Sequence, residues 1–469
     1  MSSINLKYLL KLSLVSAMGG LLFGYDWVVI GGAKPFYELY YNINESPPLQ
    51  GWAMSSALIG CIFGAMMAGW FTDRFGRKKL LIASAVLFAV SSYGTGTANQ
   101  FAFFIIFRII GGLGIGIAST VSPIYIAEVA PKKVRGIFVS INQLTIVLGI
   151  LLAQIVNWQI AQPVPEGSTS LQILQSWNGM VGWRWMFWAE LVPSLAFFFL
   201  MFFVPETPRF LVKVARFENA ARILTRIGGD EYAEENMKSI RNTLTNESAR
   251  LSIKPLFKKS LYPVLIIGIT LAVFQQWCGI NVIFNYAQEV FTSAGYDVNE
   301  MFLNIVITGS INLVFTIIAM GLVDRIGRRK LMLIGAVGLA IIYMLVGLFY
   351  LLKLNGLPIL ILLLSGIGIY AMSLAPVTWV VISEIFPNRL RGIALSVATL
   401  FLWISSSLLV LTFPILNQAV GTSSTFWIYG LVCIAGSIFI FYRLPETKGK
   451  SLEEIEFEIL KTNINHEKS

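Results

Sequence analysis

The sequence predicts an all-α membrane protein with twelve transmembrane helices in two six-helix bundles, joined by a cytoplasmic helical linker. The first observation is composition, because the 469 residues are 56% hydrophobic and only 13% charged, about half the charge of a soluble domain. The second is a series of apolar stretches of the ~20 residues that a spanning helix needs. The third is a set of short motifs that recurs in the same order in both halves of the chain. These features exclude a disordered chain, a secreted disulfide scaffold and an ordinary soluble enzyme.

Apolar stretches mark the expected spans in order along the chain. The first six are centred near residues 20, 62, 88, 112, 146 and 195, and the other six near 272, 311, 340, 370, 403 and 434. Between the two sets, the polar segment 205–259 has the hydrophobic spacing of an amphipathic helix. The first apolar run extends well beyond a signal-peptide core, so we interpret it as a retained span. The expected units are residues 1–204, 205–259, 260–445 and a cytoplasmic tail, 446–469.

Positively charged residues predict the orientation of the spans. They gather after spans two, four, eight and ten, and include Arg74, Arg77, Lys78, Lys79, Lys132, Lys133, Arg135, Arg325, Arg328, Arg329, Lys330, Arg389 and Arg391. The loops on the opposite side offer mainly Lys34, Arg184 and Lys353. By the positive-inside rule, both termini and the linker face the cytoplasm of a multi-pass inner-membrane protein. We therefore interpret the formal net charge of +10 as a topological signal and expect no nucleic-acid partner.

Three short motifs repeat between the halves and carry most of these charges. Asp-Arg-Phe-Gly-Arg-Lys at 73–78 recurs as Asp-Arg-Ile-Gly-Arg-Arg at 324–329. Glu128 with Arg135-Gly136 recurs as Glu384 with Arg391-Gly392, and Pro-Glu-Thr recurs at 205–207 and 445–447. Acids and arginines at neighbouring helix ends attract one another, and the helix dipoles add to the attraction. We expect these pairs to hold the two halves together on the cytoplasmic side and to separate when that side opens. The alternative is that they only anchor topology. The predicted gating set is Asp73, Arg74, Arg77, Glu128, Arg135, Asp324, Arg325, Arg328, Glu384 and Arg391.

Three ionisable residues lie within apolar spans, namely Asp26, Arg108 and Glu190. A charge at the bilayer centre costs about 2.5–3.5 kcal/mol on insertion scales, so each needs a partner or a purpose. We expect Asp26 and Arg108 to pair, either as a proton-carrying site or as a static lock between helices. Glu190 either modulates proton access or is a solvated residue near the end of its helix.

The ordered motifs resemble those of the sugar porter family of the major facilitator superfamily, and are most similar to the bacterial xylose–proton symporters. The similarity runs from Gly-Gly-Leu-Leu-Phe-Gly-Tyr-Asp at 19–26, through Arg-Ile-Ile-Gly-Gly at 108–112, to Pro-Glu-Thr-Lys-Gly at 445–449. The resemblance implies twelve helices around a central sugar site that faces each side alternately. It also implies proton coupling, because proton-coupled members have an aspartate at the position of Asp26, where passive facilitators usually have asparagine.

Amide side chains in the spans are candidates for sugar binding, because each amide offers a donor and an acceptor without a buried charge. Interhelical hydrogen bonding is the alternative for any single amide. The resemblance implies that the set binds sugar, that Trp379 stacks on it and that Trp403 lies near the inner end. The predicted substrate-binding residues are Gln143, Gln275, Gln276, Asn281, Asn312, Trp379 and Trp403.

The chain departs from the family pattern at Leu402, Asn285 and Trp27. The family usually has an amide before the tryptophan of span eleven, a tyrosine at position 285 and a smaller residue after the aspartate of span one. These changes remove one amide and alter two groups near the gates. They allow a monosaccharide other than xylose or glucose, such as arabinose, or a polyol.

The function that these observations predict is proton-coupled symport of a monosaccharide, a pentose or hexose, with a facilitated sugar or polyol uniporter as the alternative. A sugar-sensing receptor is a further alternative, but such members carry longer cytoplasmic tails. No Walker lysine motif, histidine-based constellation or metal-ligand cluster is evident in the sequence. We therefore expect no enzymatic activity, cofactor or metal. The expected partners are a sugar, protons and the lipid bilayer, and the expected functional unit is a monomer.

Overall fold

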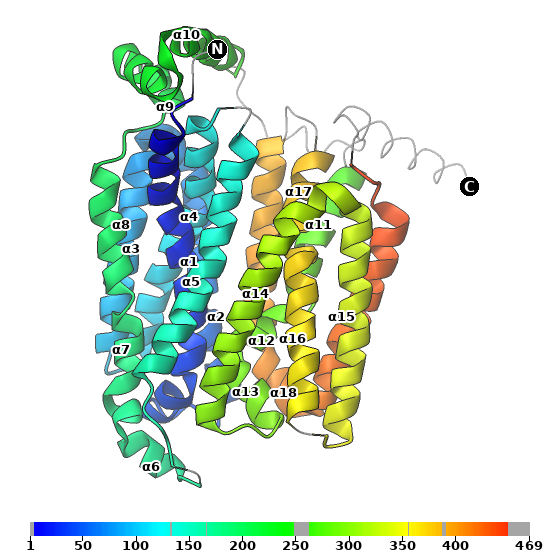
Figure 1. The fold of residues 1–469 in the computed structure, drawn as a ribbon. Coiled ribbons are helices and arrows are strands. Elements are labelled where there is room, and N and C mark those ends of the chain that lie inside the picture. Colours follow the sequence, from blue (N-terminus) through cyan, green and yellow to red (C-terminus); the bar gives the residue numbers. More distant parts are fainter. Residues whose placement is uncertain are drawn as a thin grey trace.

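Long apolar helices account for most of the chain in a computed structural model, which describes residues 4–448 except 132–133, 166, 248–261, 355 and 387–390. Eleven helical segments within these ranges are long and apolar enough to cross a membrane. We call α1–α8 the first half and α11–α18 the second half. The two halves lie side by side (Figure 1).

The first half contains six spans. Its first five helices are α1 (Leu6–Tyr40), α2 (Pro47–Phe75), α3 (Arg77–Thr97), α4 (Phe101–Val129) and α5 (Arg135–Ile160). The sixth span is broken into a π-helical turn, η1 (Asn178–Gly182), and the helices α7 (Trp183–Trp188) and α8 (Leu191–Phe202), and it is preceded by the short α6 (Ser170–Gln175). Small residues bring these helices close: a Cβ atom on Gly112 of α4 would lie only 1.8 Å from the carbonyl oxygen of Ala57 on α2.

The second half repeats the arrangement. It consists of α11 (Tyr262–Trp277), α12 (Ile280–Asn285), α13 (Ala287–Ser293), α14 (Val298–Ile326), α15 (Arg328–Leu351), α16 (Leu357–Met372), α17 (Leu374–Ile385) and α18 (Arg391–Arg443). The 53 residues of α18 are too long for one crossing, since a spanning helix needs about 20. Gly421 interrupts α18 with non-helical dihedrals, φ 80° and ψ 162°. Because α18 is therefore two spans, the expected twelve-helix architecture is confirmed.

A polar helical segment follows the first half. It contains α9 (Pro208–Lys213) and α10 (Phe217–Glu247), the latter kinked at Gly229 where φ is 84°. The segment has its own small core, which includes Leu211, Ala220 and Ile227. The amphipathic helix expected here is thus present. The division into four units stays a prediction, and residues 248–259 of the expected linker lie outside the described residues.

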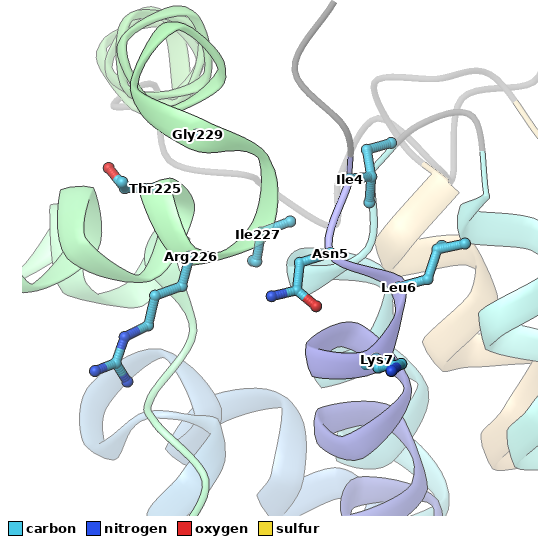
Figure 2. Close-up of a pocket in the computed structure, with 8 residues that line it drawn as sticks. All are labelled: Ile4, Asn5, Leu6, Lys7, Thr225, Arg226, Ile227 and Gly229. Atoms are coloured by element: carbon cyan, nitrogen blue, oxygen red, sulfur yellow. The ribbon is translucent and has the colours of Figure 1, made fainter.

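The N-terminus of α1 lies against this segment at one end of the bundle, which we call the linker end (Figure 1). The backbone N–H of Asn5 donates to the carbonyl oxygen of Ile227 at 2.8 Å. An open pocket of about 510 Å³ lies beside this contact, between residues 4–7 and the kink at Gly229 (Figure 2). The segment is therefore attached to the first span as well as to the span that precedes it.

Candidate functional site

Asp26 and Arg108 form a buried ion pair between α1 and α4, as the sequence predicts. Each residue is only 1% exposed. Arg108 Nη1 donates to Asp26 Oδ1, and Arg108 Nη2 donates to the Asp26 carbonyl oxygen at 3.3 Å. Asp26 Oδ2 has no hydrogen-bond partner among the residues that the structure describes. The pair therefore neutralises the guanidinium while leaving one carboxylate oxygen able to take up a proton.

Glu190 lies at the junction of α7 and α8, where it is as buried as Asp26. Ser92 Oγ of α3 donates to Glu190 Oε2 at 2.9 Å. Asp26 and Arg108 lie within electrostatic range of this carboxylate. The alternative of a solvated residue near a helix end is therefore wrong, because Glu190 is a second buried carboxylate beside the ion pair. Its role in proton access stays a prediction.

The amides of the seventh span lie together where the helix is interrupted. Gly279 has a left-handed conformation with φ 86°, and it separates α11 from α12. Across this break, Asn281 Nδ2 donates to Gln276 Oε1 at 2.5 Å. Gln275 Nε2 donates to the carbonyl oxygen of Ala375 at 3.1 Å, which links α11 to the tenth span. Gln275 Oε1 is buried and has no partner in the described part of the chain.

Asn312 belongs to a buried polar stripe on α14. Asn304, Thr308 and Thr316 are buried with it at intervals of four residues, a spacing that places them on one helix face. The sequence analysis named only Asn312, although the interval of four was visible in the sequence. Gln143 of α5 is half-buried, and the structure leaves its role as a prediction.

Trp403 joins the first half to the second through an aromatic cluster. Its ring centroid lies 5.7 Å from that of Phe23 and 5.9 Å from that of Trp27, both on α1. The indole N–H of Trp403 is buried without a partner among the described residues. Trp379 is half-buried on α17. Trp27, one of the departures from the family pattern, is therefore part of this contact between the halves.

The other two departures are also buried. Leu402 is 4% exposed beside Trp403, where an apolar side chain needs no hydrogen-bond partner. Asn285 Nδ2 donates to the carbonyl oxygen of Asn281 at 3.0 Å, within α12. Asn285 thus bonds to its own helix, and its amide lies one turn from a candidate sugar-binding residue.

At the linker end, the repeated motifs form ion pairs within each half. Arg77 Nη2 lies 2.8 Å from Glu128 Oε1, which joins α3 to α4. Arg328 Nη2 lies 3.1 Å from Glu384 Oε1, which joins α15 to α17. We expected such pairs across the two halves. In this structure they link neighbouring helices of the same half instead, because each arginine begins a helix and each acid lies in the last turn of the helix beside it.

The Pro-Glu-Thr motifs supply helix caps that the sequence analysis did not assign. Glu206 accepts the backbone N–H groups of Arg77 and Lys78 at the start of α3, each at 3.1 Å. Glu446 accepts the N–H of Arg328 at 2.9 Å in the same way at the start of α15. A carboxylate at a helix N-terminus is favoured by the helix dipole. Burial raises the pKa of Glu206, and the N–H donors oppose this shift.

The remaining members of the gating set are peripheral or not described. Asp73 is exposed and lies 3.8 Å from Arg77 Nη2. Arg74 stacks on Trp70 at 5.6 Å, and Arg135 Nε donates to the carbonyl oxygen of Ala130 at 3.4 Å. Arg325 is exposed, and its carbonyl oxygen accepts Lys448 Nζ at 2.6 Å. The side chains of Asp324 and Arg391 lie outside the described residues.

Lys34 was placed in a loop by the sequence analysis, and this assignment is wrong. Lys34 is 1% exposed on α1. Its Nζ lies 2.8 Å from Glu38 Oε1 and also pairs with Glu289 of α13. The expectation of only three ionisable residues within spans is therefore also wrong. The interval of four between Lys34 and Glu38, a spacing that suits helical ion pairs, was the available signal.

Comparison with known proteins shows which family the chain belongs to. The family model "Sugar (and other) transporter" matches residues 12–458. The chain belongs to this sugar transporter family. It is 40% identical to the arabinose-proton symporter of Bacillus subtilis over 97% of this chain and 96% of that protein. It is 38% identical to the D-xylose-proton symporter of Escherichia coli, over 96% of each.

A solved structure supports the same architecture. The inward open conformation of the xylose transporter XylE from E. coli superposes with a TM-score of 0.84 at 37% identity. The comparison covers 96% of this chain and all of that one. This sugar transporter family member thus has the twelve-helix fold with two halves, and the relatives that match it are transporters rather than enzymes.

Proposed function

We propose that this sugar transporter is a proton-coupled symporter of a monosaccharide that works by alternating access. The observation that carries the proposal is the buried pair of Asp26 and Arg108, in which Asp26 Oδ2 is left without a partner in the described residues. A passive carrier of a neutral sugar needs no titratable group at this depth, where a charge is costly. The names of the arabinose-proton and D-xylose-proton symporters support the same function.

In this mechanism, Asp26 takes up a proton at its free oxygen and its ion pair with Arg108 weakens. The guanidinium then faces Glu190, the other buried carboxylate within electrostatic range. A change in the position of α1 relative to α4 would therefore change the protonation of Asp26. We propose that this exchange couples proton movement to the reorientation of the two halves, and that Glu190 modulates it.

We propose that the sugar binds among Gln143, Gln275, Gln276, Asn281, Asn312, Trp379 and Trp403. Two buried groups support this site, because the side-chain Oε1 of Gln275 and the indole N–H of Trp403 lack partners among the described residues. Together they offer one acceptor and one donor to a ligand hydroxyl. An unpaired buried polar group is costly, so a sugar that bonds to both would remove that cost.

We propose that the linker end is cytoplasmic, that the protein lies in the inner membrane and that it functions as a monomer. Orientation follows from the many arginines and lysines that lie just before α3, α5 and α15 or in their first turns. We propose that the helix ends at this end form the cytoplasmic gate, and that Arg77–Glu128 and Arg328–Glu384 hold those helix ends in position within each half.

The test is uptake into proteoliposomes with an imposed proton gradient and a panel of competing sugars and polyols. One proton moving through 100 mV supplies about 2.3 kcal/mol, which corresponds to about fifty-fold accumulation. Asp26→Asn should lose this uphill uptake and retain counterflow exchange. Asp230→Asn, on the exposed face of α10, is the matched control and should retain both.

Three outcomes would contradict the proposal. Undiminished proton-driven accumulation by Asp26→Asn would exclude this residue as the coupling site. Equal steady-state sugar with and without an uncoupler in the unmodified protein would favour the facilitated uniporter. Failure of every monosaccharide and polyol to compete would overturn the substrate class.

A further inference from the structure

Lys34 forms an ion pair that crosses from one half of the molecule to the other. It lies on α1 of the first half, and its partner Glu289 lies on α13 of the second half. The ion pairs Asp26–Arg108, Arg77–Glu128 and Arg328–Glu384 each stay within one half. The pair of Lys34 is thus placed to respond to movement between the halves.

The two carboxylates around Lys34 differ in their surroundings. The Glu38 side chain is 6% exposed and lies on the same helix as Lys34, one turn away. The Glu289 side chain is 24% exposed and lies on the opposite half. If the halves separate, Glu289 is the partner that can move into water, while Glu38 travels with Lys34 and continues to neutralise it.

Aromatic side chains also lie near these three residues in the described part of the chain. Lys34 Nζ lies 5.6 Å from the ring centroid of Tyr286, and Tyr37 is the neighbouring phenol on α1. Among the described residues, Glu38 and Glu289 are the charged groups that act on Lys34. One buried cation therefore stands between two anions, of which one is on its own helix.

The end of the bundle opposite the linker end is closed around this pair. Figure 1 shows α13 near that end, far from α10. A Cβ atom on Gly31 of α1 would lie 3.1 Å from the carbonyl oxygen of Phe284. The rings of Phe36 and Phe302 stack across the halves with centroids 6.3 Å apart. At the linker end, in contrast, the described ion pairs do not join the halves.

We infer that Lys34, Glu38 and Glu289 form an external ion lock: Glu289 is the releasable latch, and Glu38 holds the charge of Lys34 while the lock is open. This inference rests on the proposed alternating access. Removal of one partner from a buried pair leaves an uncompensated charge. Loss of Glu289 should therefore favour opening, whereas loss of Glu38 should oppose it, because Lys34 then has no anion except Glu289.

The test measures how readily the external end opens, without using transport. A cysteine introduced as Phe302→Cys, buried when the end is closed, is labelled from outside with a membrane-impermeant maleimide. The native cysteines are buried; they are Cys61, Cys278 and Cys433. When Glu289→Gln is added to the Phe302→Cys parent, labelling should be about tenfold faster than in the parent. This corresponds to a change of about 1.4 kcal/mol in the opening equilibrium. Glu38→Gln should be labelled more slowly than the parent.

The opposite signs separate a lock from a merely structural cluster. Loosened packing would speed labelling in both variants, and that result would overturn the inference, as would equal rates in all three proteins. Lys34→Met provides a second route, since loss of the shared cation should also speed labelling. Proteoliposome uptake by the parent is measured in parallel, so that failure of the lock and failure of the proposed symport are distinguishable.

Discussion

Arg108 is a buried cation that bonds to Asp26 through two of its nitrogen atoms. Its guanidinium is 1% exposed and bonds to both the side chain and the carbonyl oxygen of Asp26. A buried ion pair adds little net stability, yet loss of one partner is strongly destabilising because the remaining charge has no counterion. We therefore expect the loss of either residue alone to cost more stability than the intact pair contributes.

We predict that Arg108→Gln lowers the free energy of unfolding by about 3–5 kcal/mol, because Asp26 is left ionised and buried. The double variant Asp26→Asn, Arg108→Gln should recover part of this loss, since both charges are then absent. Thermal unfolding in detergent measures the stability, and uphill uptake should be absent in both. A double variant no more stable than Arg108→Gln would show that the loss arises from packing.

Trp27 is a second residue whose role can be tested by substitution, because it contacts a candidate sugar-binding residue. Its indole contacts Trp403 across the halves, with centroids 5.9 Å apart. Because a large ring occupies space beside Trp403, a candidate sugar-binding residue, it limits the room for a ligand on that side. We therefore interpret Trp27 as a determinant of sugar size.

We predict that Trp27→Thr improves the KM for hexoses relative to pentoses by about tenfold, within the range for one small group in a pocket. Proton coupling should remain, since Asp26 is untouched. Competitive uptake measures the ratio, and Trp158→Thr on the exposed face of α5 is the control. If the KM for hexoses relative to pentoses does not change, Trp27 does not determine sugar specificity.

At the scale of the element, the interruptions in helices matter most. Gly279 separates α11 from α12 and brings Asn281 to Gln276. Gly421 separates the last two spans within α18, and a Cβ atom there would meet nothing within 4 Å. A substitution at Gly421 therefore tests the cost of its positive φ without adding a steric contact.

We predict that Gly421→Ala destabilises the protein by about 1–3 kcal/mol, because φ 80° with ψ 162° is a conformation essentially restricted to glycine. Gly321→Ala within α14 is the matched control, since its Cβ would also meet nothing within 4 Å. That substitution should be neutral or stabilising by up to ~1 kcal/mol. Equal effects of the two substitutions in thermal unfolding would refute the conformational explanation.

At the scale of the whole molecule, the sequence predicted the architecture because its signals are local. Apolar length identifies each span, and an isolated charge inside a span identifies Asp26, Arg108 and Glu190. The pairing of Asp26 with Arg108 followed because few other buried ions were available. These inferences needed no knowledge of how the helices pack.

The features that the sequence analysis missed depend on tertiary structure. Lys34 lies near the end of its span, so position alone could not distinguish a loop residue from a buried one. Glu206 caps α3 although 128 residues separate it from Lys78. The partners of Arg77 and Arg328 depend on which helix ends are neighbours, and this cannot be obtained from motif order.

The capping acids and ion pairs at the linker end have a thermodynamic consequence. Each half is bonded by its own set, because Glu206 and Glu128 bond to α3 of the first half and Glu446 and Glu384 bond to α15 of the second. If each half moves as a rigid body, these bonds persist in every orientation and contribute equally to the energy of each. Interactions with no difference between two states cannot shift their populations. The balance between inward and outward orientations is then set by the contacts that cross between the halves, such as those of α2 with α18 and of α5 with α14.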